Sequence, residues 1–236
     1  MKIIFVRHGH PNYKDDCLTE LGITQADAAA ERLKDEAIDK IFCSTNGRAY
    51  ETAEHINKYH NKEITKLPFM RELGFMRIAE GYEDKYPEIL DTEFGNPWYA
   101  CNKSIGMGIN LLDADWRKNP IYEKFYYPIQ AEWAGEEFDK FLTGFGVRRE
   151  GDYYALTEEF KNETILVASH GGSSSAVLAH LFNLPLPFVS YAFRPNFTSI
   201  TVVEFIGNPN ETVSPRITLF NDARHIEASP DQNKYH

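Results

Sequence analysis

Two histidines in this chain each stand between a short apolar run and a glycine. Residues 3–6 lead into Arg7 and His8, and residues 165–168 lead through a serine to His170. A neutral imidazole is nucleophilic near pH 7, because its unperturbed pKa lies near 6.5. A guanidinium can bind two oxygens of a phosphate at once. These residue types can therefore attack and hold a phosphoryl group, although the types alone leave open which histidine is the nucleophile.

The runs before the two histidines indicate how they are positioned. Each run is apolar and rich in β-favouring residues, without a polar break. That pattern is typical of strands that are buried on both faces of a parallel sheet. Ligands of such sheets bind outside the carboxyl ends of the strands. We therefore expect His8 and His170 to converge on one site, whereas a single histidine after a strand would more often be a turn or packing residue.

A second arginine has a position that favours an anion. Residues 38–43 read as another strand, and residues 44–46 supply caps for a helix that runs to about Tyr59. Arg48 falls in the first turn of that helix, where free N–H groups and the helix dipole attract negative charge. The dipole disfavours a cation there, and a bound phosphate would explain the arginine. An ordinary surface arginine is the alternative.

The remaining periodicities predict the other elements. Thr24 is the expected N-cap of a helix whose alanines and Leu33 share one face. Further elements are expected as a strand at 64–67, a helical pattern from 135, a short hairpin at 152–154, a helix at 173–182 and closing strands at 197–206 and 216–220.

Several of these motifs together resemble one known family. Arg-His-Gly at 7–9, Ser-Thr-Asn-Gly-Arg-Ala at 44–49, Ser-His-Gly-Gly at 169–172 and Asn-Asp-x-x-His-Ile at 221–226 stand in the order found in the histidine phosphatase superfamily, the phosphoglycerate-mutase-like proteins. The resemblance covers about residues 1–81 and 135–226. It implies an α/β fold of three αβα layers around a mostly parallel central sheet.

The resemblance also implies roles for the residues that match its motifs. His8 would be the nucleophile that becomes phosphorylated, and His170 would contact the phosphoryl group as a second catalytic residue. Arg7 and Arg48 would bind the phosphate, together with His170 and Gly171. The design requires no cofactor and no metal ion, and the spacing of the histidines fits no metal site.

The proton donor is matched less closely. The resemblance assigns this role to Glu72, whose Met70-Arg71-Glu72 stands where the family has a Leu-x-Glu element. Glu80, before Gly81, is a rival, because the interval to the following Gly-x-x-Glu-Gly element is altered. For both glutamates an ordinary surface position is the alternative.

The sequence departs from the family at the expected mouth of the site. His10 and Pro11 stand where an acidic or glutamine side chain and a hydroxyl residue are usual. Lys14 occupies a position that is asparagine in the mutase and bisphosphatase branches, and Asn12 is the nearest asparagine. His10 and Asn12 are therefore candidate substrate-binding residues, and the departures bear on the substrate more than on the reaction.

Residues 82–134 depart from a compact phosphatase. All three tryptophans of the chain lie there, among several tyrosines, and glycines and prolines interrupt any long helix. We interpret this segment as an aromatic-rich cap inserted over the active site of a single domain, residues 1–236. A small satellite core that touches no substrate is the equal alternative.

Composition limits the classes of partner. The net charge of −10 argues against a nucleic-acid partner, whose binding surface would be basic. Three cysteines without paired spacing indicate reduced thiols, and neither a leader nor an apolar run of membrane length is present. A cytoplasmic protein with no membrane partner is expected, and its oligomeric state is left open.

The combined expectation is a metal-independent phosphomonoester hydrolase, a histidine phosphatase. It would act through a phosphohistidine intermediate on a small phosphorylated metabolite. A phosphoglycerate mutase-type phosphotransferase is the first alternative, disfavoured because the insertion lacks that branch's Arg-Arg-Ser-x-Asp-x-Pro-Pro segment. A catalytically weak phospho-ligand-binding protein is the second, disfavoured because such a protein has no need of a nucleophile beside its donors.

Overall fold

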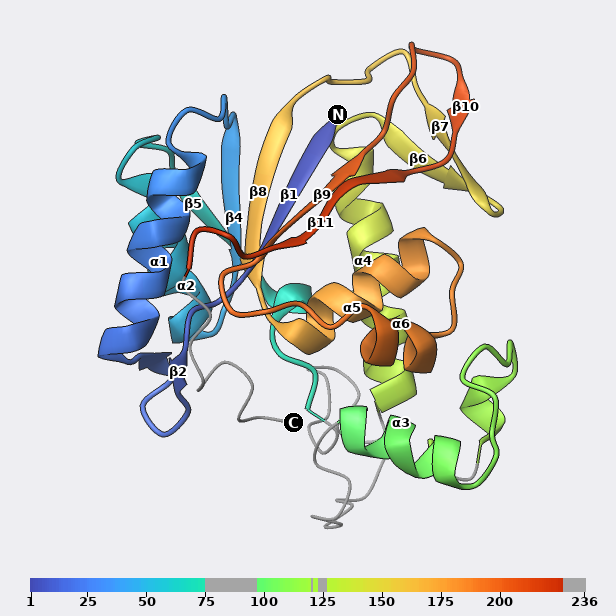
Figure 1. The fold of residues 1–236 in the computed structure, drawn as a ribbon. Helices are drawn as coiled ribbons and strands as arrows, with labels where there is room; N and C mark the ends of the chain where they lie inside the picture. The colour runs from blue at the N-terminus through green and yellow to red at the C-terminus, as the bar shows by residue number, and fades with distance from the viewer. Residues whose placement is uncertain (75–96, 120, 123–126, 227–236) are drawn as a thin grey trace.

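A six-stranded sheet forms the centre of the protein (Figure 1). The computed structural model describes residues 1–74, 97–119, 121–122 and 127–226. The strand order is β11-β9-β1-β8-β4-β5, and β1, β8, β4 and β5 run parallel while β9 is antiparallel to β1 and to β11. The strands are β1 (Lys2–Arg7), β4 (Lys40–Ser44), β5 (Ile64–Leu67), β8 (Thr164–Ser169), β9 (Ile200–Glu204) and β11 (Arg216–Asp222).

Helices cover both faces of this sheet (Figure 1). Along β1, Ile3 and Phe5 belong to one hydrophobic cluster, and Ile4 and Val6 belong to the other. Such alternation is what a strand buried on both faces requires. The helices are α1 (Glu20–Leu33) and α2 (Gly47–Asn57) on one face, and α4 (Tyr127–Thr143) and α5 (Gly171–Leu181) on the other. The predicted three-layer αβα fold with a mostly parallel sheet is confirmed.

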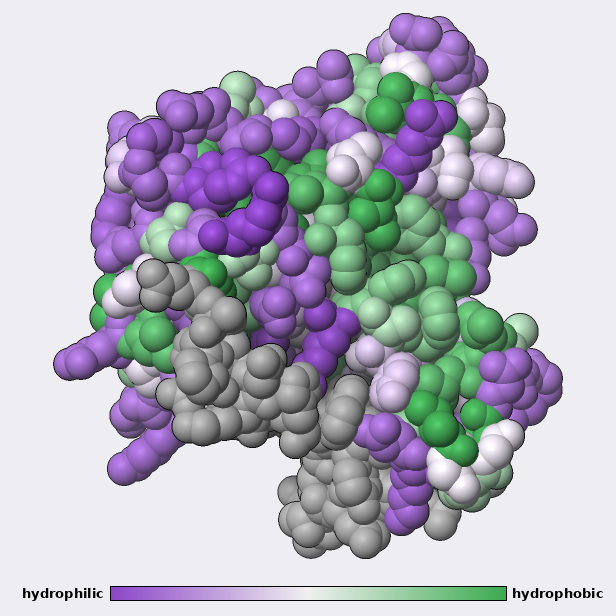
Figure 2. Space-filling model, viewed as in Figure 1, coloured by the Kyte–Doolittle hydropathy of each residue, from purple (hydrophilic) through white to green (hydrophobic). Residues whose placement is uncertain are grey.

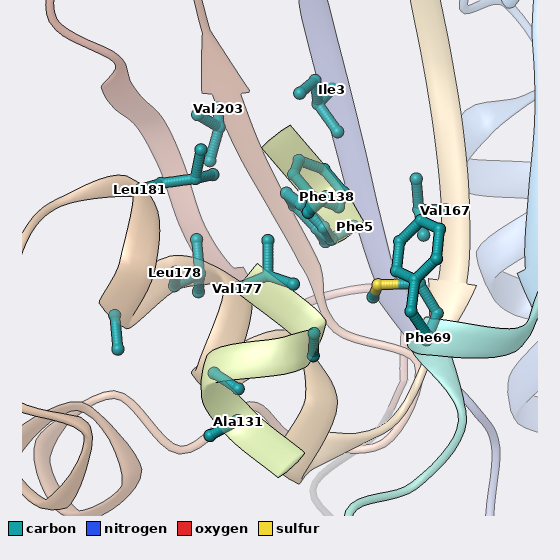
Figure 3. Packing of buried hydrophobic residues seen from close by; sticks show 14 of the residues in the cluster. Ile3, Phe5, Phe69, Ala131, Phe138, Val167, Val177, Leu178, Leu181 and Val203 are labelled. Carbon is teal, nitrogen blue, oxygen red and sulfur yellow. The ribbon is translucent and has the colours of Figure 1, made fainter. Parts of the chain in front are cut away.

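The larger cluster fills the space between the sheet and α4 and α5. Figure 3 shows Phe5 and Val167 on the sheet facing Phe138 of α4 and Val177 of α5. The rings of Phe5 and Phe138 lie 5.7 Å apart between centroids. This apolar packing fixes α5 against β1 and β8.

On the surface, hydrophobic residues gather over α5, α6 and β11 (Figure 2).

Smaller elements surround the sheet. A three-stranded sheet has the order β10-β7-β6, and β2 and β3 form a short hairpin after β1. These elements are β2 (Pro11–Asn12), β3 (Cys17–Leu18), β6 (Val147–Glu150), β7 (Tyr153–Leu156), β10 (Thr212–Val213), the 3₁₀ turns η1 (Pro68–Met70) and η4 (Trp116–Lys118), and the helices α3 (Pro97–Gly106) and α6 (Leu186–Ala192). The hairpin predicted at 152–154 belongs to the longer hairpin of β6 and β7, whose turn is residues 151–152. Helix α6 was not predicted.

The predicted N-cap of the first helix is wrong. Thr19 caps α1, with extended backbone angles and a side chain that accepts a hydrogen bond from Gly22 N at 3.1 Å. Thr24 lies inside the helix, where its hydroxyl donates to the carbonyl of Glu20 one turn earlier. Both threonines precede apolar periodic residues, so the sequence pattern did not distinguish them. The apolar face itself is buried as expected.

The insertion predicted at 82–134 is described only in part. Residues 75–96, 120 and 123–126 lie outside the described residues. Helix α4 begins at Tyr127 rather than near residue 135, so the last residues of the predicted cap belong to a helix of the main layer. In α3, Cys101 Sγ donates to the carbonyl of Pro187 in α6 at 3.3 Å, and the rings of Trp116 and Tyr122 pack 5.5 Å apart. That the insertion covers the site remains a prediction.

In the described part of the chain, no helix combines the length and apolarity needed to span a membrane.

A close backbone contact joins the loop after β1 to the start of α1. A Cβ atom on Gly22 would lie 2.2 Å from the carbonyl oxygen of His10. Alanine normally favours a helix over glycine by about 1 kcal/mol. We nevertheless expect Gly22→Ala to lower the free energy of unfolding by about 2 kcal/mol, since overpacking costs more than propensity gains. Urea unfolding measures this.

Gly106→Ala is the matched control, because a Cβ at that helical glycine meets nothing within 4 Å. We expect it to leave the stability unchanged or to raise it. Equal stability of the Gly22 and Gly106 variants would contradict the close contact.

Candidate active site

The two histidines lie side by side at the carboxyl ends of adjacent strands. Strands β1 and β8 are paired in parallel up to their last residues, Arg7 and Ser169. His8 and His170 follow directly, and their ring centroids lie 5.0 Å apart. Both rings are buried, and the N–H of His8 donates to the carbonyl of Ser169 at 2.8 Å. The sheet thus brings together the two histidines that the sequence singled out.

The surroundings of His8 fix its tautomer and its charge. Nδ1 lies 2.7 Å from the carbonyl oxygen of Gly9, so Nδ1 carries the proton and donates it there. The lone pair is then on Nε2, which accepts a hydrogen bond from Arg48 Nε at 3.3 Å. Burial, together with the charges of Arg7 and Arg48, holds the pKa of His8 well below its usual value. His8 is a neutral imidazole with an oriented Nε2 lone pair.

Arg7 lies beneath the site as the last residue of β1. Its Nη1 donates to the carbonyl of Pro195 at 2.8 Å, and its guanidinium carbon lies 4.0 Å from the centroid of the Phe197 ring. Burial lowers the pKa of Arg7 to about 10, so the group stays charged at neutral pH. Its buried Nε has no hydrogen-bond partner among the described residues. A Cβ on Gly171 would lie 3.7 Å from this Nε, so the start of α5 borders the same atom.

Arg48 is held at the N-terminus of α2 by Asp16. This carboxylate pairs with Arg48 Nη1 and accepts the N–H of Gly47 at 2.8 Å and the amide of Asn46 at 3.1 Å. Asp16 therefore offsets the unfavourable position of a cation at a helix N-terminus. Sequence reasoning missed Asp16, because its position 32 residues before Arg48 gives no periodic or motif signal.

His170 is the N-cap residue of α5, and one nitrogen of its ring has no hydrogen-bond partner among the described residues. Its Nε2 lies 2.7 Å from the hydroxyl oxygen of Ser44, another residue that sequence reasoning did not identify. Its Nδ1 is buried without a hydrogen bond among the described residues, 3.8 Å from Glu72 Oε2. Burial is the main cause that lowers the pKa of His170 well below its usual value. With Ser44 accepting from Nε2 or donating to it, the ring can present either a donor or an acceptor at Nδ1.

Glu72 reaches the site from the segment after η1. Its Oε1 accepts the N–H groups of Leu73 and Gly172, both at 3.1 Å. A Cβ on Gly172 would lie 2.5 Å from that oxygen, so a glycine leaves room for the carboxyl group. Burial raises the pKa of Glu72, while Arg7 and Arg48 oppose the rise. Glu80, the rival proton donor, lies outside the described residues.

The two candidate substrate-binding residues have different surroundings. The His10 ring lies 5.6 Å from Phe197 between centroids, and its Nδ1 lies 2.9 Å from Thr19 Oγ1. It therefore borders the site and is held by the cap of α1. Asn12 instead forms a local turn, in which Oδ1 accepts the N–H of Lys14 and Nδ2 donates to Asp15.

Among the residues that the structure describes, one set of groups could hold a metal ion. One ligand atom each of His8, Glu72 and His170 lies within 4.8 Å of the others. Arg7 and Arg48 border the same atoms and repel a cation, since both lower the pKa of His8. The charge balance of this pocket therefore fits an oxyanion better than a metal ion.

The fold agrees with the comparisons with known proteins. Residues 3–107 match the family model described as Histidine phosphatase superfamily (branch 1). This segment is less than half of the chain and is similar to that superfamily, and the solved structures below show that the whole chain has the phosphoglycerate-mutase-like fold.

Individual relatives are similar over most of the chain. "Putative phosphoserine phosphatase 2" of Hydrogenobacter thermophilus is 24% identical over 194 residues, 78% of this chain and 80% of that protein. The solved phosphoserine phosphatase mutant of Entamoeba histolytica, in complex with phosphoserine, is 22% identical with a TM-score of 0.59, covering 96% of this chain and 99% of that one. Mycobacterial glucosyl-3-phosphoglycerate phosphatase is 21% identical with a TM-score of 0.61, covering 93% and 98%.

The environment of Glu72 predicts a measurable titration. We expect its carboxyl group to titrate above the ordinary glutamate pKa of about 4.3, since burial disfavours the carboxylate. Arg48→Ala should raise this pKa further, because it removes a cation that favours the charged form. Carbon-13 NMR of glutamate-labelled protein measures both values. Arg32→Ala, on α1, is the control, and a Glu72 midpoint at or below the ordinary value would contradict the geometry.

Proposed function

We propose that the chain hydrolyses phosphomonoesters of small metabolites through a phosphohistidine formed on His8. The observation that carries this proposal is a neutral, oriented imidazole between two guanidinium groups, beside two buried nitrogens that have no partner among the described residues. An unpaired buried polar group costs about 1–3 kcal/mol. A phosphoryl group that accepts from Arg7 Nε and His170 Nδ1 would remove that cost. His170 then holds its proton on Nδ1.

In the first step, His8 Nε2 attacks phosphorus. The N–P bond forms as the bond to the leaving oxygen breaks, and the ring gains a positive charge that Gly9 O stabilises through Nδ1–H. Arg48 Nε, which donates to Nε2 in the free protein, then donates to a phosphoryl oxygen. Donors fixed in advance around a reacting phosphoryl group lower the barrier, because no reorganisation is needed. The backbone N–H of Gly171 at the start of α5 is a further donor.

Glu72 supplies the proton for the leaving oxygen. Its raised pKa favours the acid form, and it lies on the His170 side of the pocket. In the second step, its carboxylate accepts a proton from water as that water attacks phosphorus. The N–P bond breaks, inorganic phosphate leaves and neutral His8 is restored.

The relatives support a small phosphorylated substrate. The phosphoserine phosphatase of Entamoeba histolytica, which has this fold, was solved with phosphoserine and with 3-phosphoglyceric acid. We assign His10 to the wall that contacts the non-phosphoryl part of the substrate, because it packs beside Phe197 at the site. Asn12 belongs to the same hairpin and is the weaker of the two candidates, since its amide is used within a turn.

A phosphotransferase is the second candidate function. The "Probable phosphoglycerate mutase GpmB" of Photorhabdus laumondii is 38% identical over 82 residues, 31% of this chain and 38% of that protein. A mutase shares the phosphohistidine with a hydrolase and differs in the acceptor. The fate of the phosphoryl group therefore separates the two functions.

A labelling experiment tests the nucleophile. A phosphoramidate survives alkali and breaks in acid, so brief incubation with a ³²P-labelled phosphomonoester and an alkaline quench should leave label on the peptide that carries His8. Water should release it as inorganic phosphate, whereas a mutase would pass it mainly to a phosphoglycerate. A chelator should not prevent labelling, because guanidinium groups neutralise the phosphate.

His8→Ala should abolish the label and lower turnover of p-nitrophenyl phosphate by roughly a thousandfold or more. His55→Ala should behave like the wild type, because this side chain bonds to Asp27 of α1 and not to the groups of the site. Acid-stable label, or label that is lost with chelator, would refute the mechanism.

The leaving group tests the proton donor. Glu72→Gln should lower kcat for alkyl phosphates by roughly a hundredfold or more, because an alkoxide needs a proton to leave. Hydrolysis of p-nitrophenyl phosphate should fall much less, since nitrophenolate leaves without help. Steady-state kinetics on both substrates measure the difference. Equal losses on the two substrates, or a selective loss that appears with Glu80→Gln instead, would remove Glu72 from this role.

A further inference from the structure

The loop at residues 194–199 sets the position of Arg7. The carbonyl of Pro195 accepts Arg7 Nη1 at 2.8 Å, and the Phe197 ring lies 4.0 Å from the guanidinium carbon. The same ring lies 5.7 Å from that of His8 between centroids. Main-chain hydrogen bonds also join the loop to the end of β1, from Arg7 N to Ser199 O at 3.3 Å. A displacement of this loop would therefore move the guanidinium that faces the phosphate.

Asn221, at the end of β11, holds this loop on both sides of Pro195. Its Oδ1 accepts the N–H of Asn196 at 2.7 Å, and its Nδ2 donates to the carbonyl of Arg194 at 3.3 Å. One amide group thus binds the two residues that flank the carbonyl on which Arg7 rests. The backbone of Asn221 is fixed in turn, since its N–H donates to Thr201 Oγ1 at 3.1 Å in β9.

The backbone conformations here are unusual. Asn221 has a φ of 49°, in the left-handed region that asparagine tolerates better than most residues. Thr198 has a φ of 51°, which is rare for a β-branched side chain and persists only where neighbours over-determine it. Its Oγ1 lies 3.2 Å from Nε2 of His225, four residues after Asn221. The C-terminal segment therefore contacts the loop at two places, one of them strained.

We propose that Asn221 is a positioning residue of the active site. Its side chain holds the 194–199 loop so that Pro195 O and Phe197 orient Arg7 toward the phosphoryl group. Asn221 itself makes no contact with the substrate in this arrangement. The proposal rests on the proposed function of Arg7, and it gives the Asn-Asp-x-x-His-Ile segment a role in phosphate binding.

Asn221→Gly is the appropriate variant, because glycine keeps the positive φ and removes only the amide. We expect it to lower kcat/KM for p-nitrophenyl phosphate by about tenfold, since small misplacements of a positioning group carry large penalties. The inhibition constant of inorganic phosphate should rise in parallel, because Arg7 binds the phosphate in the ground state as well. Asn221→Asp keeps the acceptor for Asn196 N and should lose less.

A double-mutant cycle shows whether Asn221 acts through Arg7. In an Arg7→Ala background, Asn221→Gly should change kcat/KM less than about twofold, because residues that act through one group are not additive. Full additivity of the two losses would overturn the proposal, and so would wild-type phosphate inhibition in Asn221→Gly. If Asn221→Gly does not fold, the same cycle with Asn221→Asp shows whether the two losses are additive.

Arg224→Ala is the matched control for the C-terminal segment. Arg224 binds Asp222 at 2.8 Å and is largely exposed. This variant should keep both the kcat/KM and the phosphate inhibition of the wild type. An Arg7→Ala variant with normal turnover would reject the proposed function itself, whereas an impaired Arg7→Ala beside a normal Asn221→Gly would reject only the positioning role.

Discussion

The active site depends on burying two imidazoles and two guanidinium groups together. Burial favours neutral imidazoles, and the charges of Arg7 and Arg48 strengthen that preference. The guanidinium groups would be costly to bury alone. Pro195 O and the Phe197 ring support one of them, and Asp16 pairs with the other. The result is a positively charged pocket that contains two neutral imidazoles, which is the combination that the proposed attack on a phosphate dianion requires.

The parts of this site that follow from local sequence could be predicted. Buried strands, a histidine at the end of each and Arg48 in a first helical turn are all encoded within a few residues. Parallel pairing of β1 and β8 then brings His8 and His170 to the same edge of the sheet. Glu72 was predicted as the proton donor from the resemblance to a family, because residue spacing alone did not assign it a role.

The supporting contacts could not be predicted, because they join residues far apart in the chain. Ser44 meets His170 across 126 positions, and Asn221 meets Asn196 across 25. Each contact depends on the positions of loops in the folded chain. The hydrophobic periodicity of the sequence carries no information about those positions. The misplaced cap at Thr24 has a related cause, since two threonines offered equivalent local signals and the packing of Gly22 against His10 selected Thr19.

The first turn of α5 has a mechanical consequence. His170 is the N-cap residue of this helix, and the N–H of Gly172, in its first turn, donates to Glu72 Oε1. His170 and the Glu72 carboxyl group are thereby both attached to the first turn of α5, a helix that the packing in Figure 3 holds against the sheet. A shift of the helix would therefore move both side chains together. The distance between the His170 ring and the Glu72 carboxyl group is thus less sensitive to such a shift than the distance of either group from the strands.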